Sequence, residues 1–214
     1  TDTPTNNFCT LNPLEKHSSA TLGEGNLDLS TTANGWFASS GTQGITLGSG
    51  PWYFEAKAIS SARLYFGLSR IGQGVRGTCL NDAAEGSSDF DYMWRVTSAN
   101  TVYYGGADQS ITIAAISAND ICACHVATDG EVKFYKNDSL VVTFSTKLVT
   151  GYTYFPILSA NAFGGGTESW QANFGTPPYA NSSSQSDPDG YGDFEYTTKS
   201  AYALCTKNLG AYGG

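Results

Sequence analysis

The sequence predicts an all-β protein, a two-sheet antiparallel β-sandwich with extended N- and C-terminal straps. The clearest sign is Asn119–Phe144, where two runs of alternating apolar and polar residues meet at the Asp-Gly pair 129–130. Glycine tolerates the positive φ of a tight turn, so an Asp-Gly pair between such runs predicts a β-hairpin. A second turn at the Asn-Asp pair 137–138 then leads into a strand over Leu140–Phe144.

Two further observations support this class. Charged residues make up only 14% of the chain, against about 25% in typical soluble domains. No segment supports a helix longer than about two turns, and the best candidate is Ala201–Asn208 (AYALCTKN). Such a composition is typical of a β-rich extracellular or virion protein rather than of a helical cytosolic enzyme.

The other strands are predicted where short runs alternate, or are rich in β-branched and aromatic residues, between Gly, Ser, Asn and Asp turns. In chain order they are Asn26–Thr32, Trp36–Ser39, Ile45–Leu47, Trp52–Ile59, Arg63–Ser69, Phe90–Val96, Thr101–Tyr104, Ser110–Ala115, Tyr154–Asn161 and Glu168–Phe174.

Two pairs of these strands are close enough along the chain to form hairpins. Trp52–Ile59 and Arg63–Ser69 are expected to pair through the Ser-Ser-Ala turn at 60–62, with Glu55 and Lys57 turned outward. The strands at 90–96 and 101–104 are expected to pair about the Ser-Ala-Asn turn at 98–100.

The chain is expected to be a single domain, because all-β sandwiches of this size are commonly single. Residues 30–175 are assigned to the sandwich, 1–29 to an N-terminal extended strap, and 176–214 to a C-terminal polar loop and strap. Ile71–Asp89 lacks periodicity and is expected to be a long loop, a feature that indicates function or disorder. Asn181–Asp193 is polar and low in complexity, so we expect it to be mobile or ordered by a partner.

Charge and hydropathy exclude several classes of partner. The net charge is −8, from 19 acidic and 11 basic residues, and no cluster of Lys or Arg is present, so we expect no nucleic-acid binding. An anionic membrane surface is a poor partner for the same reason. No run approaches 18 apolar residues, so no membrane insertion is expected. The chain begins at Thr1 and is interpreted as a processed product or as part of a longer polypeptide.

The five cysteines are predicted to be reduced and mostly buried. They are Cys9, Cys79, Cys122, Cys124 and Cys205. Cys122 and Cys124 lie two apart on one strand and point the same way, a geometry in which they do not pair well. Reduced thiols imply assembly in a reducing cytoplasm.

No metal or cofactor motif emerges from the cysteines and histidines, whose spacing fits no zinc pattern, so no cofactor is expected. The two histidines are interpreted as a solvated His17 and a structurally packed His125.

Three segments of the predicted sandwich carry motifs in a fixed order: Gly50–Ser69 (GPWYFEAKAISSARLYFGLS), Asp120–Asn137 (DICACHVATDGEVKFYKN) and Tyr154–Gly175 (YFPILSANAFGGGTESWQANFG). They resemble the early hairpin, the D-x-I-G-C…F-x-x-N-G hairpin and the closing Y-P-x-x-S…N-F-G segment of the SPRY-type domain. This resemblance implies a SPRY/concanavalin-like jelly roll. Ala123 replaces a usual glycine and the usual N-G turn is Asn-Asp, so the resemblance implies a fold more than a ligand.

The flanking segments resemble a narrower group. DTPTNNFCTLNPL at Asp2–Leu14 and YGDFEYTTKSAYALCTKNL at Tyr191–Leu209 are similar to segments beside SPRY-like modules in structural proteins of tailed bacteriophages. The resemblance implies a virion-surface location, often in a tail fibre or appendage, after assembly in the host cytoplasm. The partners it implies are a host-surface glycan or receptor and other virion proteins. In a fibre, the chain is expected to form a homo-trimer.

Residues around the 98–100 turn are the best candidates for a ligand-binding surface, because loops on a rigid sandwich commonly carry recognition. The aromatic candidates, which are expected to stack on sugars, are Tyr92, Trp94 and Tyr103. Polar groups nearby come from Asp82, Glu85, Asp89, Asp91 and Arg95. Ordinary strand packing explains the same aromatic residues equally well.

Asp187, Asp189 and Asp193 surround a turn glycine and form a candidate calcium site. Oxygen-rich loops of this kind suit Ca²⁺, but the bidentate acid expected at the far end of the loop is missing. Glu195 is close but misplaced. A solvated acidic turn is therefore the favoured interpretation, and no metal site is assigned.

The carboxylates do not predict an enzyme. Retaining glycosidases need two carboxyl groups about 5–5.5 Å apart, and the acidic run E-x-D-x-x-E of lectin-fold glucanases is absent. The sequence therefore favours a non-enzymatic virion-surface module that binds a host receptor or glycan. The first alternative is a decoration or docking module that binds other capsid or tail proteins. The last is a glycoside hydrolase that uses Glu131 or Glu168.

Overall fold

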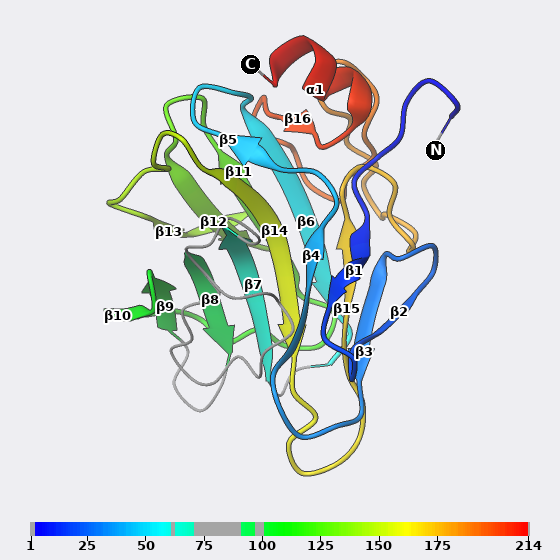
Figure 1. The fold of residues 1–214 in the computed structure, drawn as a ribbon, viewed down its shortest axis with the longest axis vertical. Helices are drawn as coiled ribbons and strands as arrows, with labels where there is room; N and C mark the ends of the chain where they lie inside the picture. Colours follow the sequence, from blue (N-terminus) through cyan, green and yellow to red (C-terminus); the bar gives the residue numbers. More distant parts are fainter. Residues whose placement is uncertain (1–2, 61–62, 71–90, 97–100, 214) are drawn as a thin grey trace.

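The computed structural model describes residues 3–60, 63–70, 91–96 and 101–213 of the 214-residue chain. Within these residues the strands form two sheets of eight that enclose a common core (Figure 1). Among the described strands the pairing is antiparallel, except that the short strand β16 lies parallel to β6. The predicted all-β sandwich is confirmed.

The first sheet has the strand order β1-β4-β14-β7-β8-β9-β10, and β5 also pairs with β14. Its strands are β1 (Leu11–Lys16), β4 (Phe37–Gly41), β5 (Ile45–Thr46), β7 (Leu64–Ser69), β8 (Tyr92–Val96), β9 (Thr101–Tyr104), β10 (Ala107–Thr112) and β14 (Thr153–Ala160).

The second sheet has the order β13-β12-β11-β6-β15-β3-β2, and β16 pairs with β6. Its strands are β2 (Thr21–Gly23), β3 (Asp28–Thr31), β6 (Trp52–Ala58), β11 (Ile121–Val126), β12 (Val132–Lys136), β13 (Ser139–Thr143), β15 (Glu168–Asn173) and β16 (Tyr202–Ala203).

The main core lies between the two sheets. Side chains alternate along each strand, so one set from each sheet points inward. Phe66 of the first sheet meets Phe54 and Phe134 of the second, with ring centroids 5.3 and 5.4 Å away. Trp52 and Trp170 are also fully buried in this core. Such burial, at about 25 cal/mol per Å² of apolar surface, is the main favourable contribution to folding.

The central predicted hairpin is confirmed. β11 pairs with β12 in unbroken register from Cys122 opposite Lys136 to Val126 opposite Val132. The two residues of the next turn, 137 and 138, have φ of 45° and 69°, as a type I′ hairpin turn requires. The predicted pairing of β8 with β9 is also present.

The predicted hairpin between residues 52–59 and 63–69 is wrong. β6 lies in the second sheet between β11 and β15, whereas β7 lies in the first sheet between β14 and β8. The chain therefore crosses from one sheet to the other between these strands. Two alternating runs joined by a short connection are compatible with a hairpin or a crossover, and partners far along the sequence decide between them.

The single helix of the described residues, α1 (Thr206–Tyr212), begins later than the predicted helix at 201–208. The first part of that segment instead forms β16, whose Tyr202 N donates to Pro51 O at 2.8 Å. In the described part of the chain, no helix has the length and apolar character needed to cross a membrane.

Both terminal segments are attached to the sandwich. Residues 11–16 and 21–23, expected to be strap, form edge strands of the two sheets. The two ends of the chain also bind each other: Cys9 N donates to Leu204 O at 2.8 Å, and Thr206 N donates to Asn7 O at 2.9 Å. Figure 1 accordingly shows α1 and the N-terminal segment at the same end of the molecule.

Residues 181–193, expected to be mobile or ordered by a partner, are ordered by the chain itself. Gln185 and Phe194 form an isolated β-bridge, and Asn181 Nδ2 donates to Asp193 Oδ1 at 3.0 Å. Phe194 is fully buried against the outer face of the second sheet, where its ring meets Tyr53 edge-on at 5.2 Å. The polar composition of residues 181–193 gives no sign of this order, because the apolar contact is made by Phe194, the residue that follows them.

Four cysteines lie in the described residues, and all four are buried and free: Cys9, Cys122, Cys124 and Cys205. This agrees with the predicted reduced thiols; Cys79 lies outside the described residues. Burial raises the pKa of the Cys9 thiol to about 11, so this thiol is protonated and unreactive near neutral pH. His125 is 9% exposed, as expected for a packed structural histidine.

Candidate functional site

A second apolar cluster lies on the outer face of the first sheet, on the side away from the main core. Because side chains alternate along strands, Tyr65, Met93 and Tyr103 point opposite to the core residues of β7, β8 and β9. We call it the outer-face cluster. It consists of Trp36, Ala38, Tyr65, Met93, Tyr103 and Ile157.

Pairing between neighbouring strands holds the outer-face cluster together. Ile157 of β14 lies opposite Gly67 of β7, which lies opposite Met93 of β8, and Met93 lies opposite Tyr103 of β9. The Trp36 ring stacks on the ring of Tyr65, with centroids 3.6 Å apart and 14° between the planes. The cluster is thus built on β4, β14, β7, β8 and β9, with Trp36 just before β4, and each of its residues is at most 9% exposed.

A buried ion pair lies beside this sheet, between the residues that precede and follow the 71–90 segment. Arg70 Nε and Nη2 lie 2.9 and 2.7 Å from Asp91 Oδ1, and the backbone N of Arg70 donates to Asp91 Oδ2 at 2.8 Å. Asp91 is 1% exposed. We call this pair the loop stem.

Aromatic rings complete the loop stem. The Arg70 guanidinium lies over the ring of Tyr152, 4.6 Å from its centroid, and 5.8 Å from that of Tyr154. The hydrogen bond with Asp91 raises the pKa of Arg70 above its usual value, so the guanidinium is charged at any physiological pH. Removing one partner of such a buried pair costs about 3–5 kcal/mol, so the loop stem firmly links the end of β7 to the start of β8.

The structure separates the aromatic residues that the sequence analysis grouped. Tyr92 and Trp94 are fully buried in the main core, where the Trp94 ring stacks on Phe134. Their rings offer no surface to a sugar, which corrects the expectation that they stack on a ligand. Tyr103 belongs to the outer-face cluster and is 9% exposed. Of the three aromatic candidates, Tyr103 alone lies on that face.

The polar candidates are divided in the same way. Asp91 forms the loop stem, and Arg95 lies in β8, opposite Tyr65 and Thr101 in the strand ladder. The remaining three, Asp82, Glu85 and Asp89, lie outside the described residues.

Sequence reasoning missed Trp36, Tyr65 and Arg70. One signal was available: in the run Tyr92-Met-Trp94, alternation places the two aromatic residues on one face and the methionine on the other. This alternation places Tyr92 and Trp94 on the core face of β8 and Met93 on its outer face, as in the structure. No local signal pairs Arg70 with Asp91, because the contact spans 21 positions.

Glu55, expected to be turned outward, does leave the core side of β6 but is completely buried. Its carboxylate accepts hydrogen bonds from Tyr53 Oη (2.8 Å), Asn173 Nδ2 (3.2 Å) and the backbone N of Glu195 and Tyr196 (both 3.0 Å). The C-terminal segment thus covers this face of the sheet. Burial raises the pKa of Glu55 to about 7, against the lowering effect of these hydrogen bonds.

The calcium candidate is explained by hydrogen bonds within the chain. Asp187 Oδ1 accepts from the backbone N of Tyr191 (2.7 Å) and Gly192 (3.0 Å), and Oδ2 accepts from Ala203 N (3.1 Å) and Asn208 Nδ2 (2.8 Å). Four N–H donors surround the carboxylate, an arrangement that opposes a cation. Among the described residues, no group of three His, Cys, Asp or Glu is arranged to hold a metal ion.

The two remaining aspartates of the candidate site are placed differently. Asp193 Oδ1 accepts from Asn181 Nδ2 and from the Ser184 hydroxyl, and Asp189 is exposed. Asp187 is 4% exposed, so the expected solvated turn is also incorrect: Asp187 is a buried anchor of the C-terminal segment.

Comparison with solved structures identifies the fold. The chain is similar to the SPRY domain of human HERC1, with a TM-score of 0.59, 15% identity and coverage of 76% of this chain and 96% of that domain. A second human SPRY domain gives 0.55 at 15% identity, covering 77% of this chain and 98% of that one. The TRIM65 PSpry domain gives 0.58 at 14%, covering 78% and 92%.

No protein-family model and no curated protein sequence matches the chain. At these identities the structural likeness shows the fold alone, which is a SPRY-type β-sandwich.

Proposed function

We propose that this chain is a non-enzymatic recognition module of a bacteriophage virion surface, in a tail fibre or appendage, which binds a host receptor or glycan. The binding surface would be the loop stem with the adjacent edge of the first sheet. The observation that carries the proposal is the buried Arg70–Asp91 pair, because a recognition surface on a sandwich requires a rigid scaffold.

The position of the loop stem supports this assignment. Asp91 continues directly into β8, and its carbonyl accepts a hydrogen bond from Gly105 N at 2.9 Å beyond the end of β9. The stem is therefore coupled to the β8–β9 hairpin. The next strand, β10, lies at the edge of the sheet and is exposed along nearly its whole length, with Ile111 40% exposed.

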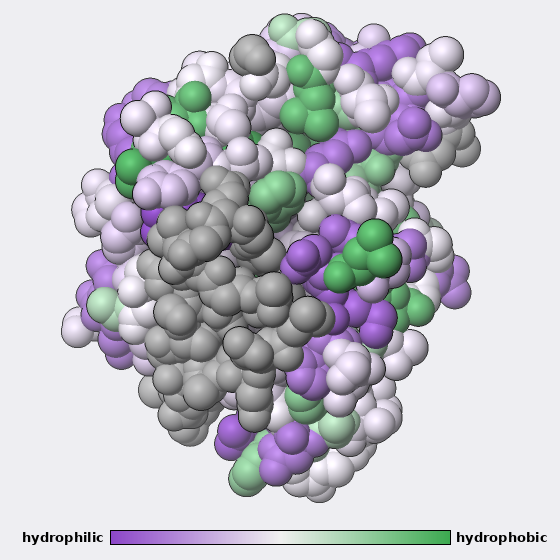
Figure 2. Space-filling view, in the orientation of Figure 1, coloured by the Kyte–Doolittle hydropathy of each residue, from purple (hydrophilic) through white to green (hydrophobic). Residues whose placement is uncertain are grey.

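The described surface also suits recognition through polar contacts rather than through one large apolar area. In the view of Figure 2, outside the grey residues, apolar patches are small and separated by polar surface. Large continuous apolar patches mark obligate interfaces and are a liability on an exposed protein. The virion setting itself rests on the resemblance of the segments at 2–14 and 191–209 to flanks of phage SPRY-like modules.

The alternative proposal is a decoration module that docks other virion proteins through extended ends. The terminal segments make this less favourable, because their apolar residues already pack within the chain. Phe8, Phe194 and Cys205 are buried with Tyr53 on the outer face of the second sheet. Terminal segments that pack against the sandwich in this way are not free to bind other proteins.

Cell binding tests the proposal. The purified chain is incubated with a panel of candidate bacterial hosts, with and without periodate oxidation of surface sugars, and bound protein is measured. We expect binding to at least one strain, and Arg70→Met to weaken it about tenfold or more, or about 1.4 kcal/mol. Loss of binding after periodate identifies a glycan, and retention identifies a protein receptor.

The matched control is Lys147→Met, which removes an exposed cation paired with Asp129 elsewhere on the molecule. If Arg70→Met lowers the melting temperature strongly, Ile111→Asp on the exposed edge of β10 replaces it. Absence of binding to every strain contradicts the proposal, and so does binding that neither variant weakens. Co-purification with capsid or tail proteins in that case supports the docking alternative.

A further inference from the structure

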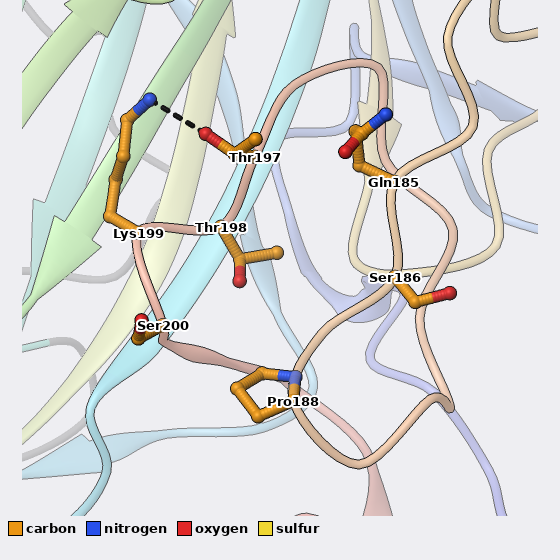
Figure 3. Close-up of a pocket in the computed structure, with 7 residues that line it drawn as sticks. All are labelled: Gln185, Ser186, Pro188, Thr197, Thr198, Lys199 and Ser200. Carbon is orange, nitrogen blue, oxygen red and sulfur yellow. Dashed lines mark hydrogen bonds between the residues drawn. The ribbon is translucent and has the colours of Figure 1, made fainter.

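A pocket of about 510 Å³ lies within the C-terminal segment, away from the loop stem. Two stretches of chain form its walls, residues 185–188 on one side and 197–200 on the other (Figure 3). Its volume lies within the range of about 300–1,000 Å³ that is usual for small-molecule sites. The lining residues are Gln185, Ser186, Pro188, Thr197, Thr198, Lys199 and Ser200.

The lining is rich in hydroxyl groups. Four of the seven residues are Ser or Thr, one is an amide and one is a proline. Figure 3 shows Thr198 projecting from its wall into the space toward the opposite stretch. Thr198 is 4% exposed as a whole residue, so its side chain is held within this wall of the pocket.

The pocket carries no uncompensated charge. Its one charged residue is Lys199, whose ammonium group binds the Asp138 carboxylate and donates to Thr197 Oγ1 at 2.9 Å. The ammonium group also lies over the ring of Tyr135, 5.4 Å from its centroid. An anion would compete with Asp138 for this lysine, and a cation would find no free carboxylate among the lining residues. The lining therefore suits a neutral polar ligand.

The wall at 197–200 is preformed. Lys199 and Ser200 have φ of 57° and 63°, left-handed conformations that are strained in residues other than glycine. Hydrogen bonds on either side hold them: Ala201 N donates to Thr198 O at 3.1 Å, and Tyr202 N donates to Pro51 O at 2.8 Å. Because β16 then pairs with β6, the strained wall is fixed to the sandwich.

From these observations we infer that this pocket is a saccharide-binding site for a small neutral sugar. Sugar hydroxyls both donate and accept hydrogen bonds, as can the hydroxyl of Thr198 and the amide of Gln185 on the opposite wall. Pro188 supplies an apolar surface for the C–H groups of the ring. The site deepens the proposed recognition function by naming a ligand class, but it lies apart from the loop stem and is tested separately.

The test is an NMR titration of the full ¹⁵N-labelled chain with four probes: D-glucose, D-galactose, D-mannose and N-acetyl-D-glucosamine. We expect at least one sugar to shift the backbone amides of residues 185–187 and 197–200, with a Kd of about 1 mM or tighter. Thr198→Val keeps the shape of the side chain and removes its hydroxyl, so we expect about tenfold weaker binding. Thr143→Val, at an exposed position on β13, is the matched control.

Three results overturn the inference. They are absence of shifts with all four sugars up to about 50 mM, shifts confined to other parts of the molecule, and equal affinity of wild type and the Thr198 variant. If Thr198→Val changes the melting temperature, Gln185→Ala, which removes the amide from the opposite wall, provides the same comparison. The titration uses free sugars, so a negative result does not contradict cell binding through the loop stem. Equally, absence of cell binding does not contradict a sugar site in this pocket.

Discussion

Glu55 shows how burial changes the chemistry of a single residue. Its carboxylate has no exposed surface and, in the described structure, forms no ion pair, while four N–H and O–H donors surround it. The loss of water outweighs these donors and raises the pKa from 4.5 to about 7. The folded state therefore binds a proton more tightly than the unfolded chain does, which links stability to pH.

The sign of this linkage gives the first prediction. Stability supplied by the protonated Glu55 is fully present below about pH 4.5 and is lost as the pH rises toward about 7, on the order of 3 kcal/mol for the whole shift. We expect the difference in unfolding free energy between wild type and Glu55→Gln to move by this amount in favour of the variant across that range. Denaturant titrations at several pH values measure it. A difference that is constant with pH contradicts the assignment.

Asp187 gives a second prediction at the same scale. Four N–H donors already fill its carboxylate, so a cation gains nothing by approaching it. We expect millimolar CaCl₂ to leave the melting temperature unchanged, and Asp187→Asn to lower stability by about 1.5–3 kcal/mol because bonds to a charged acceptor are lost. MgCl₂ at the same ionic strength is the control. A rise in melting temperature specific to calcium would restore the metal site.

At the scale of elements, the close approach of β7 to β8 depends on Gly67. A Cβ at this position would lie 1.8 Å from Tyr92 O and 3.2 Å from Met93 Cα, and backbone atoms within a sheet cannot move away cheaply. In the row of the outer-face cluster that runs from Ile157 to Met93, the position between them therefore carries no side chain. Loss of this contact would separate the two strands that carry the loop stem.

We accordingly expect Gly67→Ala to destabilise the protein by about 3 kcal/mol or more, at the upper end of overpacking effects. Gly23→Ala is the matched control, because a Cβ there meets only Asp28 Cβ at an ordinary 3.6 Å. Thermal or chemical unfolding of both variants measures the difference. Equal stability of the two variants would show that β7 and β8 separate more easily than the structure indicates.

At the scale of the whole molecule, the C-terminal segment acts as a cover for the second sheet. Residues of this segment bury the outer face of β6 and β11, where Tyr53 and Ala123 pack against Phe194, Ala201 and Ala203. Glu55 also receives two of its four donors from this segment. The sandwich is therefore incomplete without it.

Deletion of residues 176–214 is expected to expose this apolar face and to leave Glu55 short of two hydrogen bonds. We expect the shortened chain to be aggregated or unfolded, as measured by size-exclusion chromatography and circular dichroism. Truncation after Tyr212 is the control, since it leaves β16 and α1 in place. A monomeric truncated chain with an unchanged melting temperature would show that the segment is an accessory rather than part of the fold.

The sequence alone predicted the all-β class and most of the strands. Alternation and turn residues are local, and they are readable wherever a strand has one buried face, as in the hairpin about Gly130. The thiols of Cys122 and Cys124 were readable for the same reason, because the strand places both on its core side.

Tertiary structure decided which surfaces are covered and which strands pair. β6 and β7 alternate like the arms of one hairpin, yet they belong to opposite sheets, because their partners lie as far along the chain as Trp170 and Leu158. Glu55 has the pattern of an exposed residue and is buried by a segment 140 positions later. Local patterning fixes the face a side chain occupies, but burial of that face depends on contacts between distant segments, which local patterning does not encode.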